Sequence, residues 1–165
     1  MSKSLTKAVP TLIAVAIVGA GATFAIASGT GDTDGPSAAQ VQYEQPPGDQ
    51  GCTPGFWKNN TNVWSGYSAS DSFNAVFGVS HTPSLTLLQA AELEGGGFNA
   101  LLRHAAAALL NSSQPLVNYG MTTSQLITAV QGAFASGEPE ALKDDLDTLN
   151  NAGCSVDAHG NPIDD

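Results

Sequence analysis

The chain has 165 residues, and its 15 acidic against 5 basic residues give a net charge of −10. A surface this acidic repels nucleic-acid phosphates and anionic lipids, so nucleic acid is excluded as an expected partner. The favoured interpretation of this charge is that excess carboxylates keep the protein in solution. The alternative interpretation is that the charge attracts cations or basic proteins. The length suits a single domain.

Residues 1–27 have the pattern of a secretory signal peptide. Lys3 and Lys7 precede an apolar run that ends near Ala25, and a second small residue stands at Ala27. A short positive region, an apolar core and an A-x-A-like site are typical of a leader cleaved on export, here after Ala27. A retained N-terminal anchor is the alternative. The sequence therefore predicts a secreted or cell-surface protein without a stable membrane span after cleavage.

Composition divides the rest of the chain into three parts. Residues 28–51 are rich in Gly, Pro, Ser and Asp and nearly free of large apolar side chains, which predicts a disordered linker. Residues 52–157 are long enough for one modest core and predict a small helical domain. Residues 158–165 predict an acidic flexible tail.

Two cysteines, Cys52 and Cys154, mark the ends of the predicted domain. An even cysteine count in an exported protein favours a disulfide. The alternative is a metal site that also uses Asp157 and His159, but the closely spaced ligand pairs of zinc sites are missing from the sequence. We therefore predict a disulfide that joins the two ends of the domain.

The segment from 85 to 152 predicts three or four helices. Thr86 with Gln89 forms the pattern of a capping box, and the glycines at 95–97 end that helix. Apolar residues recur at helical spacing from Phe98, with Arg103 and Ala107 on the opposite face and a loop at 111–115.

A second capping box stands at Thr122 and Gln125, and Gly137 is placed to end that helix in the left-handed region. Pro139 suits the first position of the last helix, which runs to Gly153. The expected core is apolar and lies on these helices: Leu88, Leu101, Leu102, Leu109, Leu126, Val130, Phe134, Leu142, Leu146 and Leu149.

The first part of the domain, 51–80, is less regular and holds six of the eleven aromatic residues. Pro54 and Gly55 favour a tight turn. Ser70 is placed to cap a short helix that ends at Gly78. Together these patterns predict a mostly all-α fold: a small disulfide-stapled helical bundle with an irregular, aromatic-rich N-terminal lobe.

Three segments carry a resemblance to a known family. The chain reads CTPGFWKN at 52–59, then TLLQAAELEGGGFNALLRHAAAALLN, and later LDTLNNAGC. This combination resembles a family of exported prokaryotic surface or secreted proteins with a C-T-P-G-[FY]-W-K-N opening and a terminal N-x-G-C. The resemblance spans about Cys52 to Cys154. It implies a secreted or surface-displayed module and supplies no catalytic residues.

Candidate catalytic and metal residues are few. His104 lies at the edge of the apolar stripe, where a structural histidine is expected, and the chain has no G-x-S-x-G motif. Asp157, Asn161 and Asp164 offer oxygen ligands for calcium, but their spacing departs from an EF-hand loop. We predict no enzymatic activity, no metal site and no cofactor.

Two functions from different classes remain. The first is a non-enzymatic secreted or cell-surface structural or interaction module, whose partners are envelope or extracellular-matrix components. The alternative is an extracellular carbohydrate-binding module in which Trp57, Trp64 and Tyr67 form an exposed platform for stacking on sugar rings. Exposure of these three side chains distinguishes the two.

Overall fold

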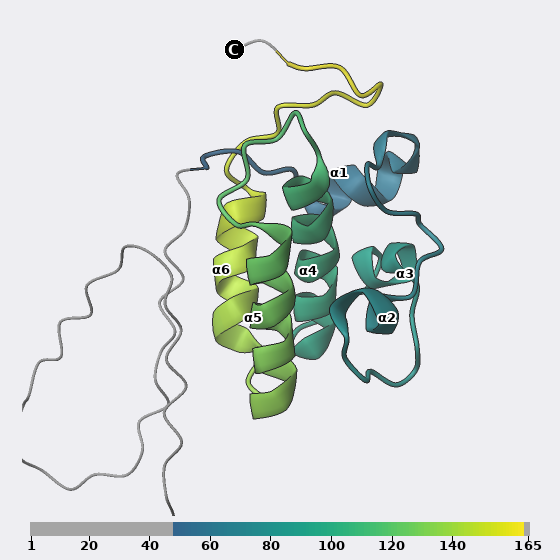
Figure 1. Cartoon of the computed structure of the whole chain (residues 1–165), viewed down its shortest axis with the longest axis vertical. Coiled ribbons are helices and arrows are strands. Elements are labelled where there is room, and N and C mark those ends of the chain that lie inside the picture. Colours follow the sequence, from purple (N-terminus) through teal and green to yellow (C-terminus); the bar gives the residue numbers. More distant parts are fainter. Residues whose placement is uncertain (1–47, 164–165) are drawn as a thin grey trace, which may run out of the picture. The chain divides into compact units, whose positions relative to one another are not determined.

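The computed structural model describes residues 48–163, which form six α-helices and one short 3-10 helix, η1, without a sheet. Figure 1 shows α5 and α6 on one side of α4 and the shorter helices on the other. The predicted fold class, a mostly helical disulfide-stapled bundle, is confirmed. The predicted signal peptide, most of the linker and Asp164 lie outside the described residues. In order, the elements are α1 (Pro54–Asn59), η1 (Thr61–Val63), α2 (Phe73–Phe77), α3 (Leu87–Ala91), α4 (Phe98–Ser113), α5 (Thr123–Ser136) and α6 (Glu140–Asn150).

Helix α4 is the centre of the bundle and contacts α1, α3, α5 and α6. Ala107 lies on the face opposite the predicted apolar stripe, and that face is buried there too, because the four alanines at 105–108 are all fully buried. Helix α3 contacts α4, and the loop after α3 is hydrogen-bonded to Arg103 on this face. Arg103 is half-buried there, and its Nη1 donates to the backbone oxygens of Leu93 (2.8 Å) and Gly95 (3.3 Å). Small alanine side chains let neighbouring helices approach α4 from every side.

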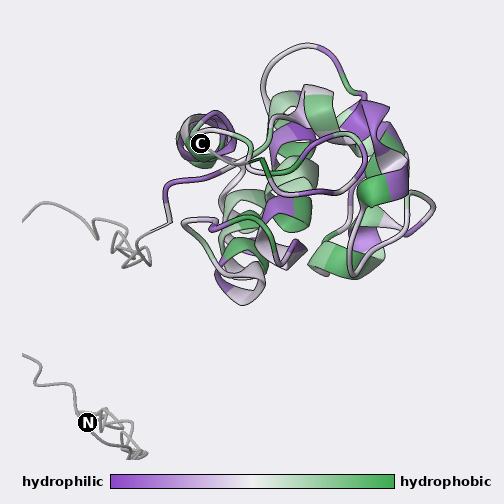
Figure 2. Cartoon of the chain, turned by 90° about the horizontal axis from the view of Figure 1, so that it is seen from above, coloured by the Kyte–Doolittle hydropathy of each residue, from purple (hydrophilic) through white to green (hydrophobic). Residues whose placement is uncertain are grey.

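The starts of α3 and α5 and the end of α5 follow the predicted patterns. Both capping boxes are present, at Thr86 with Gln89 before α3 and at Thr122 with Gln125 before α5. Gly137 ends α5 with a φ of 75°, in the left-handed region that glycine adopts without a steric penalty. In Figure 2 the helices carry both green hydrophobic and purple hydrophilic residues, as expected for helices that bury one face.

Two local predictions in the N-terminal lobe are wrong. Pro54 and Gly55 begin α1 instead of forming a tight turn, because Thr53 caps the helix and proline fits its first position, where no N–H is needed. Helix α2 is capped by Ser72, whose side chain accepts from Ala75 N, and not by Ser70.

Most of the expected core is buried. Six of the ten residues are fully buried, and three more are partly buried and packed against the core. The exception is Leu88, which is only half-buried, while its neighbour Leu87 is fully buried. The five-residue α3 turns Leu87, Ala90 and Ala91 inward, which is the i, i+3, i+4 pattern of one helical face.

The two ends of the domain meet, as predicted. Cys52 and Cys154 form a disulfide with their Cα atoms 4.3 Å apart. Beside it, Gly51 N donates to Gly153 O at 2.8 Å. Glycine is required at 51, because a Cβ there would collide with the backbone oxygen of Leu149. The folded domain therefore begins before residue 52, where the prediction placed its start, since residues 50 and 51 are hydrogen-bonded to the rest of the domain.

We expect Leu102→Ala to lower the free energy of unfolding by about 2 to 5 kcal/mol, because Leu102 is fully buried on α4 and its truncation leaves a cavity. Urea unfolding followed by circular dichroism measures the change. Leu116→Ala is the matched control, since Leu116 is 39% exposed and its truncation leaves little void. Equal small effects of both variants would mean that α4 does not lie in the core.

Candidate functional site

The three aromatic residues of the hypothetical sugar platform do not form one. Trp57 is 0% exposed, so neither face of its ring can stack on a ligand. Its indole Nε1 donates to Asn111 Oδ1 at 3.0 Å, which fixes the ring inside the bundle. Trp64 and Tyr67 are half-buried and pack against the core, and Trp64 Nε1 donates to Trp57 O at 2.9 Å. Large rings are a major share of so small a core, and the burial of Trp57 removes it from the platform on which the carbohydrate-binding alternative depends.

Polar side chains gather instead around Asn111, near the C-terminal end of α4. The sequence placed this residue in a loop, but the helix continues to Ser113 and Asn111 is fully buried. Its Oδ1 accepts from Cys52 N at 2.8 Å and from the Trp57 indole, and its Nδ2 donates to Cys52 O at 2.9 Å. Asn111 thus pairs with both backbone groups of the disulfide cysteine.

The same cluster extends to α6 through Asn150. Asn150 Oδ1 accepts from Asn111 Nδ2 at 2.9 Å and from the Tyr119 hydroxyl at 2.8 Å. Its own Nδ2 donates to His104 O at 3.0 Å. We call Trp57, Tyr119, Asn111 and Asn150, with the backbone of Cys52, the polar node. Burial raises the pKa of Tyr119, so its hydroxyl stays protonated and keeps donating to Asn150.

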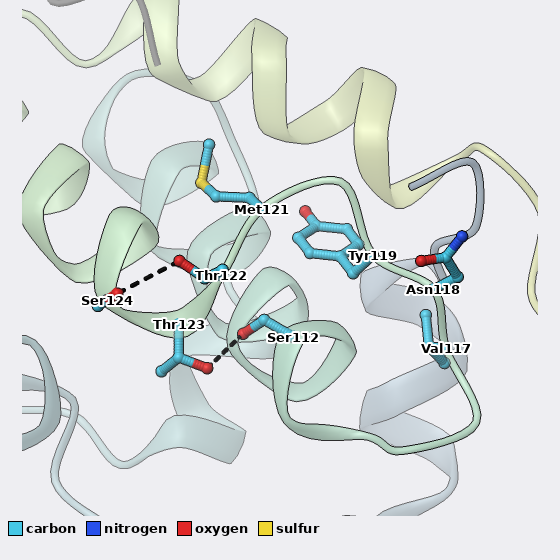
Figure 3. A pocket seen from close by; sticks show the side chains of 8 residues that line it. All are labelled: Ser112, Val117, Asn118, Tyr119, Met121, Thr122, Thr123 and Ser124. Carbon is cyan, nitrogen blue, oxygen red and sulfur yellow. Dashed lines mark hydrogen bonds between the residues drawn. The ribbon is translucent and has the colours of Figure 1, made fainter. Parts of the chain in front are cut away.

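An open hollow of about 530 Å³ lies beside the polar node, between the end of α4, the 117–122 loop and the start of α5 (Figure 3). Ser112 Oγ and Thr123 Oγ1 are hydrogen-bonded to each other at 2.9 Å across it. Hydroxyl and amide groups of this kind form hydrogen bonds and do not ionise near neutral pH. The lining of the hollow is mainly polar: Ser112, Val117, Asn118, Tyr119, Met121, Thr122, Thr123 and Ser124.

His104 is buried between α4 and α6, where its ring Nδ1 has no hydrogen-bond partner. Asp147 Oδ1, on an exposed side chain, lies 3.7 Å from this nitrogen. Burial lowers the pKa of His104, and the charges of Arg103 and Lys143 act in the same direction, while Asp147 opposes them. The structural histidine expected from the sequence is therefore buried, with one ring nitrogen, Nδ1, lacking a hydrogen-bond partner.

Two of the three residues suggested as calcium ligands, Asp157 and Asn161, form a turn. Asp157 Oδ1 accepts from the backbone N–H groups of His159 and Asn161, both at 2.8 Å. The hydrogen bonds from Asn161 lower the pKa of Asp157. In its described part, the segment predicted to be a flexible tail folds back as this turn, and Ala158 O accepts from Asn62 at 3.2 Å. Within residues 48–163 no group of three or more His, Cys, Asp or Glu side chains is arranged to hold a metal ion.

We expect the stability of the domain to fall as the pH drops below about 6.5, because the pKa of His104 is lower in the folded chain than in the unfolded one. Stability from the neutral form is complete above the unfolded pKa, and it is lost as the pH falls towards the folded pKa. Urea midpoints between pH 7.5 and 5 measure the loss. His104→Gln should flatten the profile, and an unchanged slope in that variant would contradict the assignment.

We expect Trp57→Ala to lower the free energy of unfolding by about 3 to 5 kcal/mol, because it removes a fully buried ring and a donor to Asn111. Trp64→Ala is the matched control and should cost less, since Trp64 is only half-buried. Chemical unfolding gives both values. A Trp57→Ala protein of full stability that no longer binds envelope polysaccharide would instead restore the sugar-binding alternative.

Sequence reasoning missed the polar node because its two asparagines belong to no recognised catalytic or ligand-binding pattern. Asn111 precedes two serines, which is typical of a loop, and Asn150 stands beside another asparagine at a helix end. The signal that they share is position, since each directly follows a leucine at the end of an apolar helical stripe. Comparison of the chain with protein families, with curated proteins and with solved structures finds no match.

Proposed function

We propose that this chain is a non-enzymatic module that is exported and acts at the cell surface or in the extracellular matrix through its small helical domain. The observation that carries the proposal is that the side chains of the polar node hold the fold together. The side chains that the fold gathers are two amides, an indole and a phenol, and they hydrogen-bond one another and the backbone of Cys52. Such groups build an interior and do not ionise near neutral pH.

Two further observations support export. The disulfide between Cys52 and Cys154 is of the kind that persists in oxidising compartments. Residues 1–27 have the pattern of a cleaved leader. Among the helices of residues 48–163, none has the length and hydropathy that a membrane span requires.

The acidic face of α6 suits contact with a basic or polar partner of the envelope. Asp144, Asp145 and Asp147 are all exposed on this helix. Lys143, the basic residue of α6, is engaged by its neighbours Glu140 and Asp144. The helix therefore presents net negative charge to its surroundings, which repels anionic lipid and attracts cationic groups.

We expect cells that produce the full chain to export it. The recovered protein should begin at Ser28, and peptide mapping without reductant should yield one peptide pair joined through Cys52 and Cys154. Fractionation followed by N-terminal sequencing makes the measurement. A cytoplasmic protein that begins at Met1 and carries free thiols would contradict the proposal.

A further inference from the structure

The sequence contains two Asn-x-Ser/Thr tripeptides, which is the pattern of an N-glycosylation acceptor in exported proteins. One is Asn59-Asn60-Thr61 and the other is Asn111-Ser112-Ser113. A glycosyltransferase must reach both the asparagine amide and the hydroxyl two residues later. In the structure Asn59 is exposed and Asn111 is buried. This difference distinguishes an acceptor site from a structural element.

The second tripeptide lies within α4 and is inaccessible to a glycosyltransferase. Asn111 is fully buried, and both ends of its amide are used in the polar node. Ser112 Oγ and Ser113 Oγ donate back to the helix at Leu109 O and Leu110 O, both at 3.1 Å. Residues two apart on a helix also point to different sides, so one binding site cannot hold this asparagine and its hydroxyl together.

The first tripeptide lies at a break between helices on the surface (Figure 1, α1). Asn59 is the last residue of α1 and is exposed, and Thr61 is the exposed first residue of η1. Between them Asn60 leaves the helical region, with φ −129° and ψ 53°. The helical geometry that separates the two side chains in α4 is therefore interrupted here.

The amide of Asn59 is available for reaction. Its Nδ2 donates to Gly55 O at 2.8 Å, an exposed hydrogen bond on the last turn of α1. A second N–H remains on the same nitrogen, and water replaces an exposed hydrogen bond at little net cost. The neighbouring side chains Lys58 and Asn62 are exposed as well, so the surface around the acceptor is open.

We propose that Asn59 is an N-glycosylation site, an assignment that rests on the proposed export. The co-substrate is a glycan activated as a phosphate ester of a lipid carrier. Asn59 Nδ2 attacks the anomeric carbon of the first sugar, and a C–N bond forms as the C–O bond to phosphate breaks. The lipid phosphate leaves with the electron pair, and the amide proton passes to a base of the transferase. Neither partner is oxidised or reduced.

The test is the mass of the protein recovered from the medium or envelope of its native host. The tryptic peptide that contains Asn59 should carry a glycan on most molecules, while the peptide that contains Asn111 carries none. Asn59→Gln and Thr61→Ala should each abolish the added mass. Thr61→Ser should keep it, because serine retains the hydroxyl, and Asn62→Gln is the matched control that leaves it unchanged.

The outcomes separate this assignment from the proposed export. An exported, leader-free protein with unmodified Asn59 overturns the assignment alone. A glycan on Asn111, or one that survives Asn59→Gln, also overturns it. A cytoplasmic protein that still begins at Met1 overturns the proposed export and this assignment with it.

Discussion

The fold depends on one buried amide. Asn111 forms four hydrogen bonds, to both backbone groups of Cys52, to the Trp57 indole and to Asn150. A fully buried amide would strongly destabilise the folded state if any of its polar atoms lacked a partner. Because every partner comes from another part of the chain, satisfying Asn111 fixes the start of the domain, α1 and α6 against α4 at once.

The disulfide and the polar node act on the same end of the bundle. The covalent bond holds Cys52 to Cys154 after α6, and Asn111 holds the backbone of Cys52 to α4. A disulfide that closes a loop of this length removes roughly 4 to 5 kcal/mol of chain entropy from the unfolded state in entropic models. The node then gives the joined ends one orientation, since its hydrogen bonds are directional.

Most of the helices were predicted from local signals, whereas burial that depends on packing between helices was missed. The capping boxes at Thr86 and Thr122 depend only on residues three apart, and the structure contains both. The disulfide followed from the cysteine count. Burial of Ala107 and the helical state of Asn111 could not be read in the same way, because each depends on which elements pack against α4. A serine-rich stretch favours a loop until partners elsewhere in the chain satisfy its polar groups.

The candidate site was harder to predict than the fold. Trp57 carries the same side chain whether it serves a platform or a core, and only its 0% exposure decides between them. Tyr119 lies in a segment without any motif, and its hydroxyl meets Asn150 across 31 residues of sequence, while Asn150 meets Asn111 across 39. Chemistry that arises from tertiary contacts between ordinary residues leaves no spacing pattern to detect.

The most direct test of the role of Asn111 is hydrogen exchange of the two N–H groups that donate to its side-chain oxygen, measured by NMR in the native state. The Cys52 amide and the Trp57 indole N–H should exchange as slowly as the most protected amides of α4, because both are released only when the whole domain unfolds. The indole N–H of half-buried Trp64 serves as the reference and should exchange faster. Exchange of Cys52 and Trp57 at or above the rate of Trp64 would contradict the central position of Asn111.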